Sequence, residues 1–112
     1  MNTTSVFPGF VTALPLADIP IDGLTAHLAQ GEKFQLVFMS FEKETHVPEH
    51  THAEQLELVL EGTVDLTVNR MTTTYKKGDR FYIPAGIPHS AVVHAGFSSM
   101  AFFNQADRYR TK

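Results

Sequence analysis

The sequence of 112 residues contains no cysteine and no apolar stretch approaching the roughly 20 residues that a membrane-spanning helix needs. Without cysteine the chain can form no disulfide and offers no thiolate, so nitrogen and oxygen donors must hold any metal that it binds. A strong charge of either sign is also missing, because 9 Lys and Arg against 12 Asp and Glu give a net charge of −3. This balance does not favour binding to nucleic acid or to a membrane, so the expected partners are a small molecule and a second copy of the chain.

Several catalytic and targeting signals are absent as well. The sequence has no Gly-x-Ser-x-Gly motif and no glycine-rich phosphate loop before a helix. Its first residues show no positively charged leader followed by an apolar run. We therefore expect a soluble cytoplasmic protein whose chemistry does not depend on a serine or thiol nucleophile.

Helical periodicity is missing too. From Gly31 onward, short apolar runs alternate with turn residues, and no spacing of three to four residues is sustained for a dozen positions. The pattern predicts an all-β protein whose strands form a sandwich or barrel. The expected strands are 34–42, 55–61, 63–69, 72–76, 81–83, 89–95 and 97–104.

The two ends of the chain carry weaker patterns. Pro8, Pro15 and Pro20 punctuate the first thirty residues, where we expect extended edge structure with 23–29 as a candidate strand. The tail at 107–112 is charged, and we expect it to be solvated.

Three histidines carry the clearest chemical signal in the sequence. His50 and His52 are separated by one residue, and on a β-strand side chains two positions apart point to the same side. His89 can add a third imidazole from a distant strand, so the three together predict a site for a divalent metal. The remaining histidines are expected at the surface or in structural roles; they are His27, His46 and His94.

The surroundings of these histidines resemble the two motifs of the cupin superfamily of small β-barrel proteins. The chain departs from the motifs where Glu44 replaces a leading glycine and Val93 replaces a final asparagine. The resemblance implies a single-domain cupin β-barrel, a double-stranded β-helix or jelly roll, over 1–112 with its core barrel at about 31–104. The residues that match the motif spacings are His50, His52, Gly62, Gly78, Pro84, Gly86 and His89.

The fourth ligand position of the motif is ambiguous in this sequence. Counting back from Gly62 nominates Gln55, whereas counting forward from His52 nominates Glu57. We favour Gln55, because a continuous strand fixes its distance to Gly62 while the loop after the histidines can absorb a deletion. Glu57 is then a candidate base, or a residue that hydrogen-bonds a ligand.

The predicted metal ligands are thus His50, His52, Gln55 and His89, holding one divalent transition metal. Three imidazoles and an amide are all neutral, so they leave the full charge on the metal and favour substrates with carboxylate or enolate oxygens. The donor set suits Fe, Mn, Ni, Cu or Zn, and the sequence does not choose among them.

The strand at 55–61 also predicts an oligomer. If Gln55 faces the metal, then Glu57 shares its side and three leucines face the other way. An apolar stripe of that size is unusual on a monomer, so we expect a homodimer. The leucines are Leu56, Leu58 and Leu60.

The resemblance to cupins implies dioxygenase, isomerase or decarboxylase chemistry on a small organic acid or carbonyl compound, without selecting one reaction. The alternative is a non-catalytic module that binds or senses a small molecule in the same pocket. The loss of the usual glutamate at the ligand position motivates this alternative.

Overall fold

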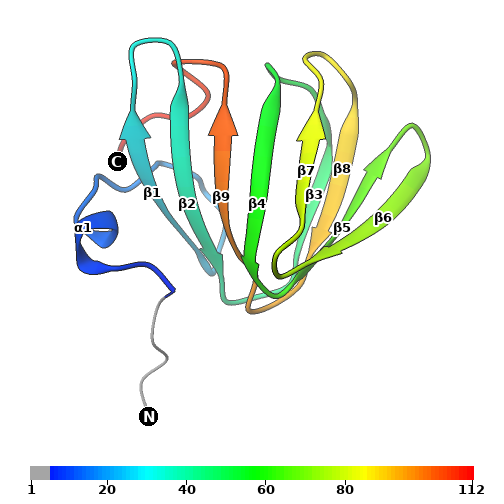
Figure 1. Ribbon diagram of the computed structural model, residues 1–112, viewed down its shortest axis with the longest axis horizontal. Coiled ribbons are helices and arrows are strands. Elements are labelled where there is room, and N and C mark those ends of the chain that lie inside the picture. Colours follow the sequence, from blue (N-terminus) through cyan, green and yellow to red (C-terminus); the bar gives the residue numbers. More distant parts are fainter. Residues whose placement is uncertain (1–5) are drawn as a thin grey trace.

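The structure, a computed structural model, describes residues 6–112, which fold into nine β-strands and one short helix (Figure 1). The prediction of an all-β protein is confirmed. The predicted extended structure of the first thirty residues includes 1–5, which lie outside the described residues. The elements in chain order are α1 Gly9–Thr12, β1 Leu24–Gln30, β2 Gln35–Phe41, β3 Thr45–His50, β4 Gln55–Glu61, β5 Thr63–Val68, β6 Met71–Lys76, β7 Arg80–Ile83, β8 His89–Val93 and β9 Ser98–Phe103.

The strands of residues 6–112 form two antiparallel sheets. One sheet has the strand order β1-β2-β9-β4-β7, and the other has the order β3-β8-β5-β6. From β2 onward the chain crosses repeatedly between the sheets, which is the connectivity of a jelly roll. The sheets keep open edges instead of closing into one hydrogen-bonded barrel, so the jelly-roll description fits better than a closed barrel.

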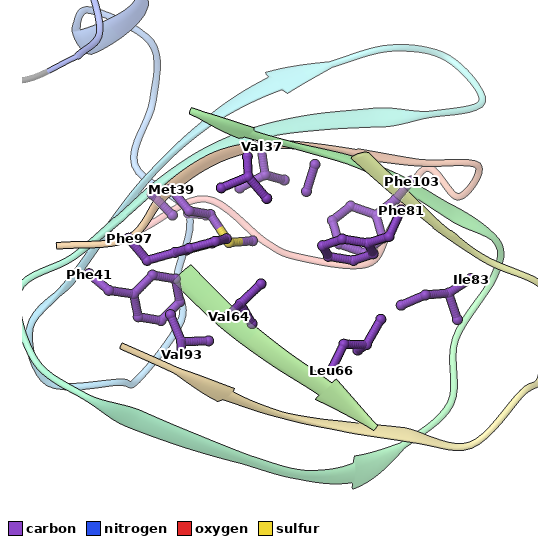
Figure 2. Packing of buried hydrophobic residues seen from close by; sticks show 14 of the residues in the cluster. Val37, Met39, Phe41, Val64, Leu66, Phe81, Ile83, Val93, Phe97 and Phe103 are labelled. Atoms are coloured by element: carbon purple, nitrogen blue, oxygen red, sulfur yellow. The ribbon is translucent and has the colours of Figure 1, made fainter. Parts of the chain in front are cut away.

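Apolar side chains from both sheets fill the space between them (Figure 2). Phe97, directly before β9, and Phe103 on β9 are almost fully buried, and Val64 and Leu66 of the second sheet point towards them. Each such side chain stabilises the fold by about 1.5–3 kcal/mol relative to its exposed state. This core holds the two sheets together and forms the walls of the cavity described below.

Strand β4 shows the alternation that the sequence predicted. Gln55 and Glu57 are buried and face the interior. Leu56 and Leu58 are 49% and 40% exposed on the outer surface. The register of β4 therefore places its polar residues inside the molecule and its leucines outside, the reverse of an ordinary half-buried strand.

Two elements were not predicted. Strand β3 is polar and contains Pro48, features that argue against a strand, but it lies at the edge of its sheet, where proline is tolerated. Its pairing with β8 is irregular between Val47 and His50. The other element is α1, and no helix in the described part of the chain is long and apolar enough to cross a membrane. The candidate strand at 23–29 is confirmed as β1, an edge strand.

The prediction that the tail is solvated is wrong for its middle residues. Tyr109 packs against the core, with its ring 5.7 Å from that of Phe103. Gln35, which is fully buried on β2, binds both backbone groups of Tyr109. The tail is therefore fixed by contacts with residues far away in the sequence, which local charge could not reveal.

Candidate metal centre

Three histidines converge at one end of the space between the sheets. His50 ends β3 and pairs in register with His89, the first residue of β8, while His52 lies in the loop that leads to β4. Ligand nitrogens of the three side chains all lie within 4.8 Å of one another. The sequence thus predicted which histidines meet, although His52 reaches the site from a loop and not from a strand. The backbone N–H of Gly86 donates to the carbonyl of His52 at 3.0 Å and ties this loop to the one before β8.

The Nδ1 atom of each histidine faces a backbone carbonyl. Because a carbonyl oxygen only accepts hydrogen bonds, each Nδ1 must carry the hydrogen, which leaves a lone pair on each Nε2 of the neutral rings. This arrangement is the usual one for metal-binding histidines, since it fixes both the tautomer and the ring orientation. The distances are 2.8 Å from His50 to Pro48, 2.6 Å from His52 to Ala53 and 2.9 Å from His89 to Ile87.

The contact between His52 and His89 tests whether the site fits a metal. The Nε2 atoms of His52 and His89 lie 3.0 Å apart, so with hydrogen on both Nδ1 atoms two lone pairs face each other. Burial lowers the pKa of His52 to about 4 and also lowers the pKa of His89, which disfavours a proton between them at neutral pH. A cation shared by neutral imidazoles relieves the repulsion, so the three histidines could hold a metal ion.

Gln55 and Glu57 lie in the same cavity as the histidines. Both are buried, and the amide Nε2 of Gln55 donates to a carboxylate oxygen of Glu57 at 2.5 Å. Burial raises the pKa of Glu57 to about 7, while the Ser99 hydroxyl and the Gln55 amide act in the opposite direction. With its nitrogen engaged by Glu57, Gln55 has its amide oxygen left, so Gln55 stays a candidate for the fourth ligand.

The cavity around this site has a volume of about 520 Å³. Most of the remaining lining is apolar and comes from both sheets: Phe41, Phe81 and Phe103 from the first, Val64 and Leu66 from the second (Figure 2). A few polar groups inside a largely apolar cavity are typical of a binding site for a small organic molecule. Arg108 and Tyr109 also line the cavity, and neither was predicted from the sequence. Nothing in the charged run 107–112 distinguishes Arg108 from Arg110.

The other histidines lie outside the cluster, as expected. His46 is mostly exposed beside Glu44. His94 bridges Glu44 and Asp65, and Nδ1 of His27 faces the carbonyl of Leu14.

Comparison with known proteins identifies the family. A sequence model described as a cupin domain matches residues 37–102, more than half of the chain. Comparison of the sequence with curated proteins gives no significant match. Among solved structures, an RmlC-like cupin from Shewanella frigidimarina is 24% identical with a TM-score of 0.76, over 96% of this chain and 97% of that chain.

In two further solved structures the match covers about a quarter of a longer chain. Salicylate 1,2-dioxygenase from Pseudoaminobacter salicylatoxidans, in adducts with gentisate, is 20% identical with a TM-score of 0.67, over 77% of this chain and 26% of that chain. Oxalate decarboxylase from Bacillus subtilis, with Mn(II) centres, is 20% identical with a TM-score of 0.65, over 76% of this chain and 26% of that chain. At these identities the likeness shows the fold alone. The match to the cupin domain over residues 37–102, together with the jelly-roll fold, establishes that this chain belongs to the cupin family.

Proposed function

We propose that this protein is a metal-dependent enzyme that acts on a small organic acid or carbonyl compound. The observation that carries the proposal is the convergence of three imidazole nitrogens, with their tautomers fixed, inside a cavity of about 520 Å³. His50, His52 and His89 would hold the metal, with the amide oxygen of Gln55 as fourth ligand. Bound there, a divalent transition metal such as Fe, Mn, Ni, Cu or Zn would supply Lewis-acid or redox chemistry.

The residues around the histidines have separate tasks in this proposal. The carboxylate of Glu57 accepts from the Gln55 amide and so orients the amide oxygen. Glu57 is also the buried carboxyl group of the cavity lining, which makes it the candidate to accept or donate a proton. The apolar walls exclude water from the substrate and strengthen electrostatic interactions inside the cavity.

The names of two structural neighbours support dioxygenase and decarboxylase chemistry on an organic acid. One is a dioxygenase named for salicylate and the other a decarboxylase named for oxalate, and both compounds are carboxylic acids. Dioxygenase, decarboxylase and isomerase chemistry all remain within the proposal.

The experiment that tests the proposal measures metal content and then turnover. Elemental mass spectrometry on untagged protein, purified without chelator or nickel resin, should find about one metal ion per chain. His89→Ala should abolish or greatly weaken this binding, because it removes one of three imidazoles, while circular dichroism shows an intact fold. His46→Ala, which removes an exposed histidine outside the site, is the control and should keep the metal.

Each stage of the experiment can contradict the proposal. Unchanged metal content in His89→Ala would show that the metal lies elsewhere. A wild-type protein that retains no metal even after reconstitution would favour the non-catalytic binding or sensing module. If metal is present, consumption of aromatic and enolisable acids, with and without oxygen uptake, separates the reaction classes.

A further inference from the structure

Arg108 brings a positive charge into the cavity from the C-terminal segment. It lines the same cavity as the three histidines, and its charge helps to lower the pKa of His52 and His89. The guanidinium carbon lies 4.5 Å from the centre of the Tyr109 ring and 5.8 Å from that of Phe103. These aromatic contacts hold the side chain against the cavity wall.

Within the part of the chain that the structure describes, no group hydrogen-bonds the guanidinium of Arg108. Among residues 6–112 no carboxylate lies within ion-pair distance of the guanidinium, and its buried Nε has no hydrogen-bond partner. A guanidinium offers five N–H donors in a planar fork that matches a carboxylate. Leaving a buried donor unpaired destabilises a protein, so a residue of this kind is better explained by a ligand than by folding.

The backbone that directly follows Arg108 is fixed, which makes the side chain a preorganised binding group. The amide of Gln35 accepts from the N–H of Tyr109 at 3.0 Å and donates to its carbonyl at 2.8 Å. One residue further on, the carbonyl of Arg110 accepts from the N–H of Asp18 at 2.6 Å. A group held in place before the ligand arrives loses less entropy on binding.

We propose that Arg108 binds the carboxylate of the substrate, an organic acid with an apolar body that lies along the aromatic wall and reaches the histidine site. The inference rests on the proposed function in one respect: it takes the histidine site as the place where the substrate reacts. The lining has two carboxyl groups: Glu57 is buried and hydrogen-bonded to Gln55, and Asp18 is exposed to solvent. Arg108 therefore decides the sign of the ligand, since it is the cavity's cation with free donors.

The test compares a carboxylate with its neutral analogue. Benzoate and benzamide are titrated into the full-length protein as purified, followed by two-dimensional NMR. Arg108→Gln and Arg108→Met remove the charge, and Met keeps an unbranched stem beside the rings. Arg110→Gln is the control, because Arg110 is an exposed arginine of the same segment whose side chain does not line the cavity.

Wild type should bind benzoate more tightly than benzamide. Both Arg108 variants should weaken benzoate binding roughly tenfold to a hundredfold and leave benzamide unchanged, as expected for loss of a charge-assisted hydrogen-bond pair. Arg110→Gln should change neither affinity. Equal loss of both affinities would show that Arg108 is only structural and would overturn the proposal, as would unchanged benzoate binding or no preference for benzoate in wild type.

The metal content of every variant is measured in the same preparations, so the two proposals fail separately. A protein without metal that still needs Arg108 for benzoate would contradict the enzyme proposal and keep this one. A metal-loaded protein whose benzoate affinity does not depend on Arg108 would contradict this inference and keep the enzyme proposal. The thermal transition of each variant shows whether it is folded, and either folded Arg108 variant is sufficient for the test.

Discussion

His94 lies outside the cavity, and its imidazole bridges two carboxylates at the surface. Its Nδ1 is 3.2 Å from Glu44 and its Nε2 is 2.8 Å from Asp65. The hydrogen bond to Asp65 is the main reason that the pKa of His94 is raised, and the contact with Glu44 adds to it. A raised pKa means that folding favours the protonated imidazole, so His94 couples the stability of the fold to pH.

The sign of this coupling gives the first prediction at the residue scale. Because the folded pKa lies above the unfolded value, the stabilisation is fully present below about pH 6.5 and is lost as the pH rises through the raised pKa. His94→Gln should therefore lower the melting temperature more at about pH 5.5 than at about pH 9. Thermal melts at both pH values measure the difference.

The control for this prediction is His46→Gln. His46 lies 3.3 Å from the same Glu44, but its side chain is 72% exposed, so solvent screens the interaction and the change should be smaller. An equal loss of melting temperature for His94→Gln at the two pH values would contradict the coupling.

The histidine site and Arg108 differ in how far the sequence alone could predict them. The histidine site could be predicted because His50 and His52 lie two positions apart in the chain and His89 belongs to a motif with fixed spacing. Arg108 could not, because its place depends on contacts between Gln35 and Tyr109, which lie 74 positions apart. Such contacts are a property of the tertiary fold and leave no local pattern.

At the scale of elements, Gly62 fixes how β4 turns into β5. Its φ of +74° lies in the left-handed region, and a Cβ there would come within 2.7 Å of the Phe97 Cα. Both the turn and the approach of the neighbouring backbone therefore require glycine. The position also belongs to the first cupin motif, so the fold explains why this motif position is a glycine.

Gly62→Ala should destabilise the protein by about 3 kcal/mol or more, since backbone strain and a steric clash add. Gly78→Ala is the matched control, because Gly78 has a φ of +92° but open space around the site of its Cβ. It should cost only the strain, about 1–2 kcal/mol. Urea denaturation of both variants measures the difference, and equal losses would show that the contact with Phe97 relaxes without cost.

Strand β3 shows why one element escaped prediction. Its residues Thr45–His50 alternate weakly and include Pro48, so propensity argues for a loop. The strand exists because β8 presents an open edge to it, and the pairing of Val47 with Ala91 fixes the start of the irregular stretch that ends at His50. The partner therefore determines this strand more than its own sequence does, which single-sequence patterns cannot report.

At the scale of the whole molecule, the outer face of the five-stranded sheet is only partly covered. Figure 1 shows β1, β2, β9, β4 and β7 side by side in this sheet. Phe7 from the N-terminal segment packs on Phe38, with ring centres 5.5 Å apart, and covers part of the face. Beyond it, a patch of large apolar side chains stays exposed; it consists of Phe34, Leu56, Leu58, Tyr82 and Phe102.

This patch is continuous across three strands, because Leu56 pairs in register with Tyr82 on one side and Phe102 on the other. An exposed apolar patch rimmed by polar residues marks an interaction surface, and we expect a second copy of the chain to cover it. Two copies related by a twofold axis would bury the same patch from both sides. Light scattering after size-exclusion chromatography should then give twice the chain mass of 12.5 kDa.

Leu56→Glu places a charge at the centre of the patch and should shift the protein to a monomer, because a desolvated carboxylate in the contact has no partner. Met71→Glu is the control, since Met71 is 74% exposed on β6, away from this sheet, and should leave the dimer intact. Both side chains are largely exposed in the single chain, so neither variant should change the circular dichroism spectrum. A wild type that stays monomeric at the highest concentration tested, or a Leu56→Glu variant that stays dimeric, would show that this face is not where two copies meet.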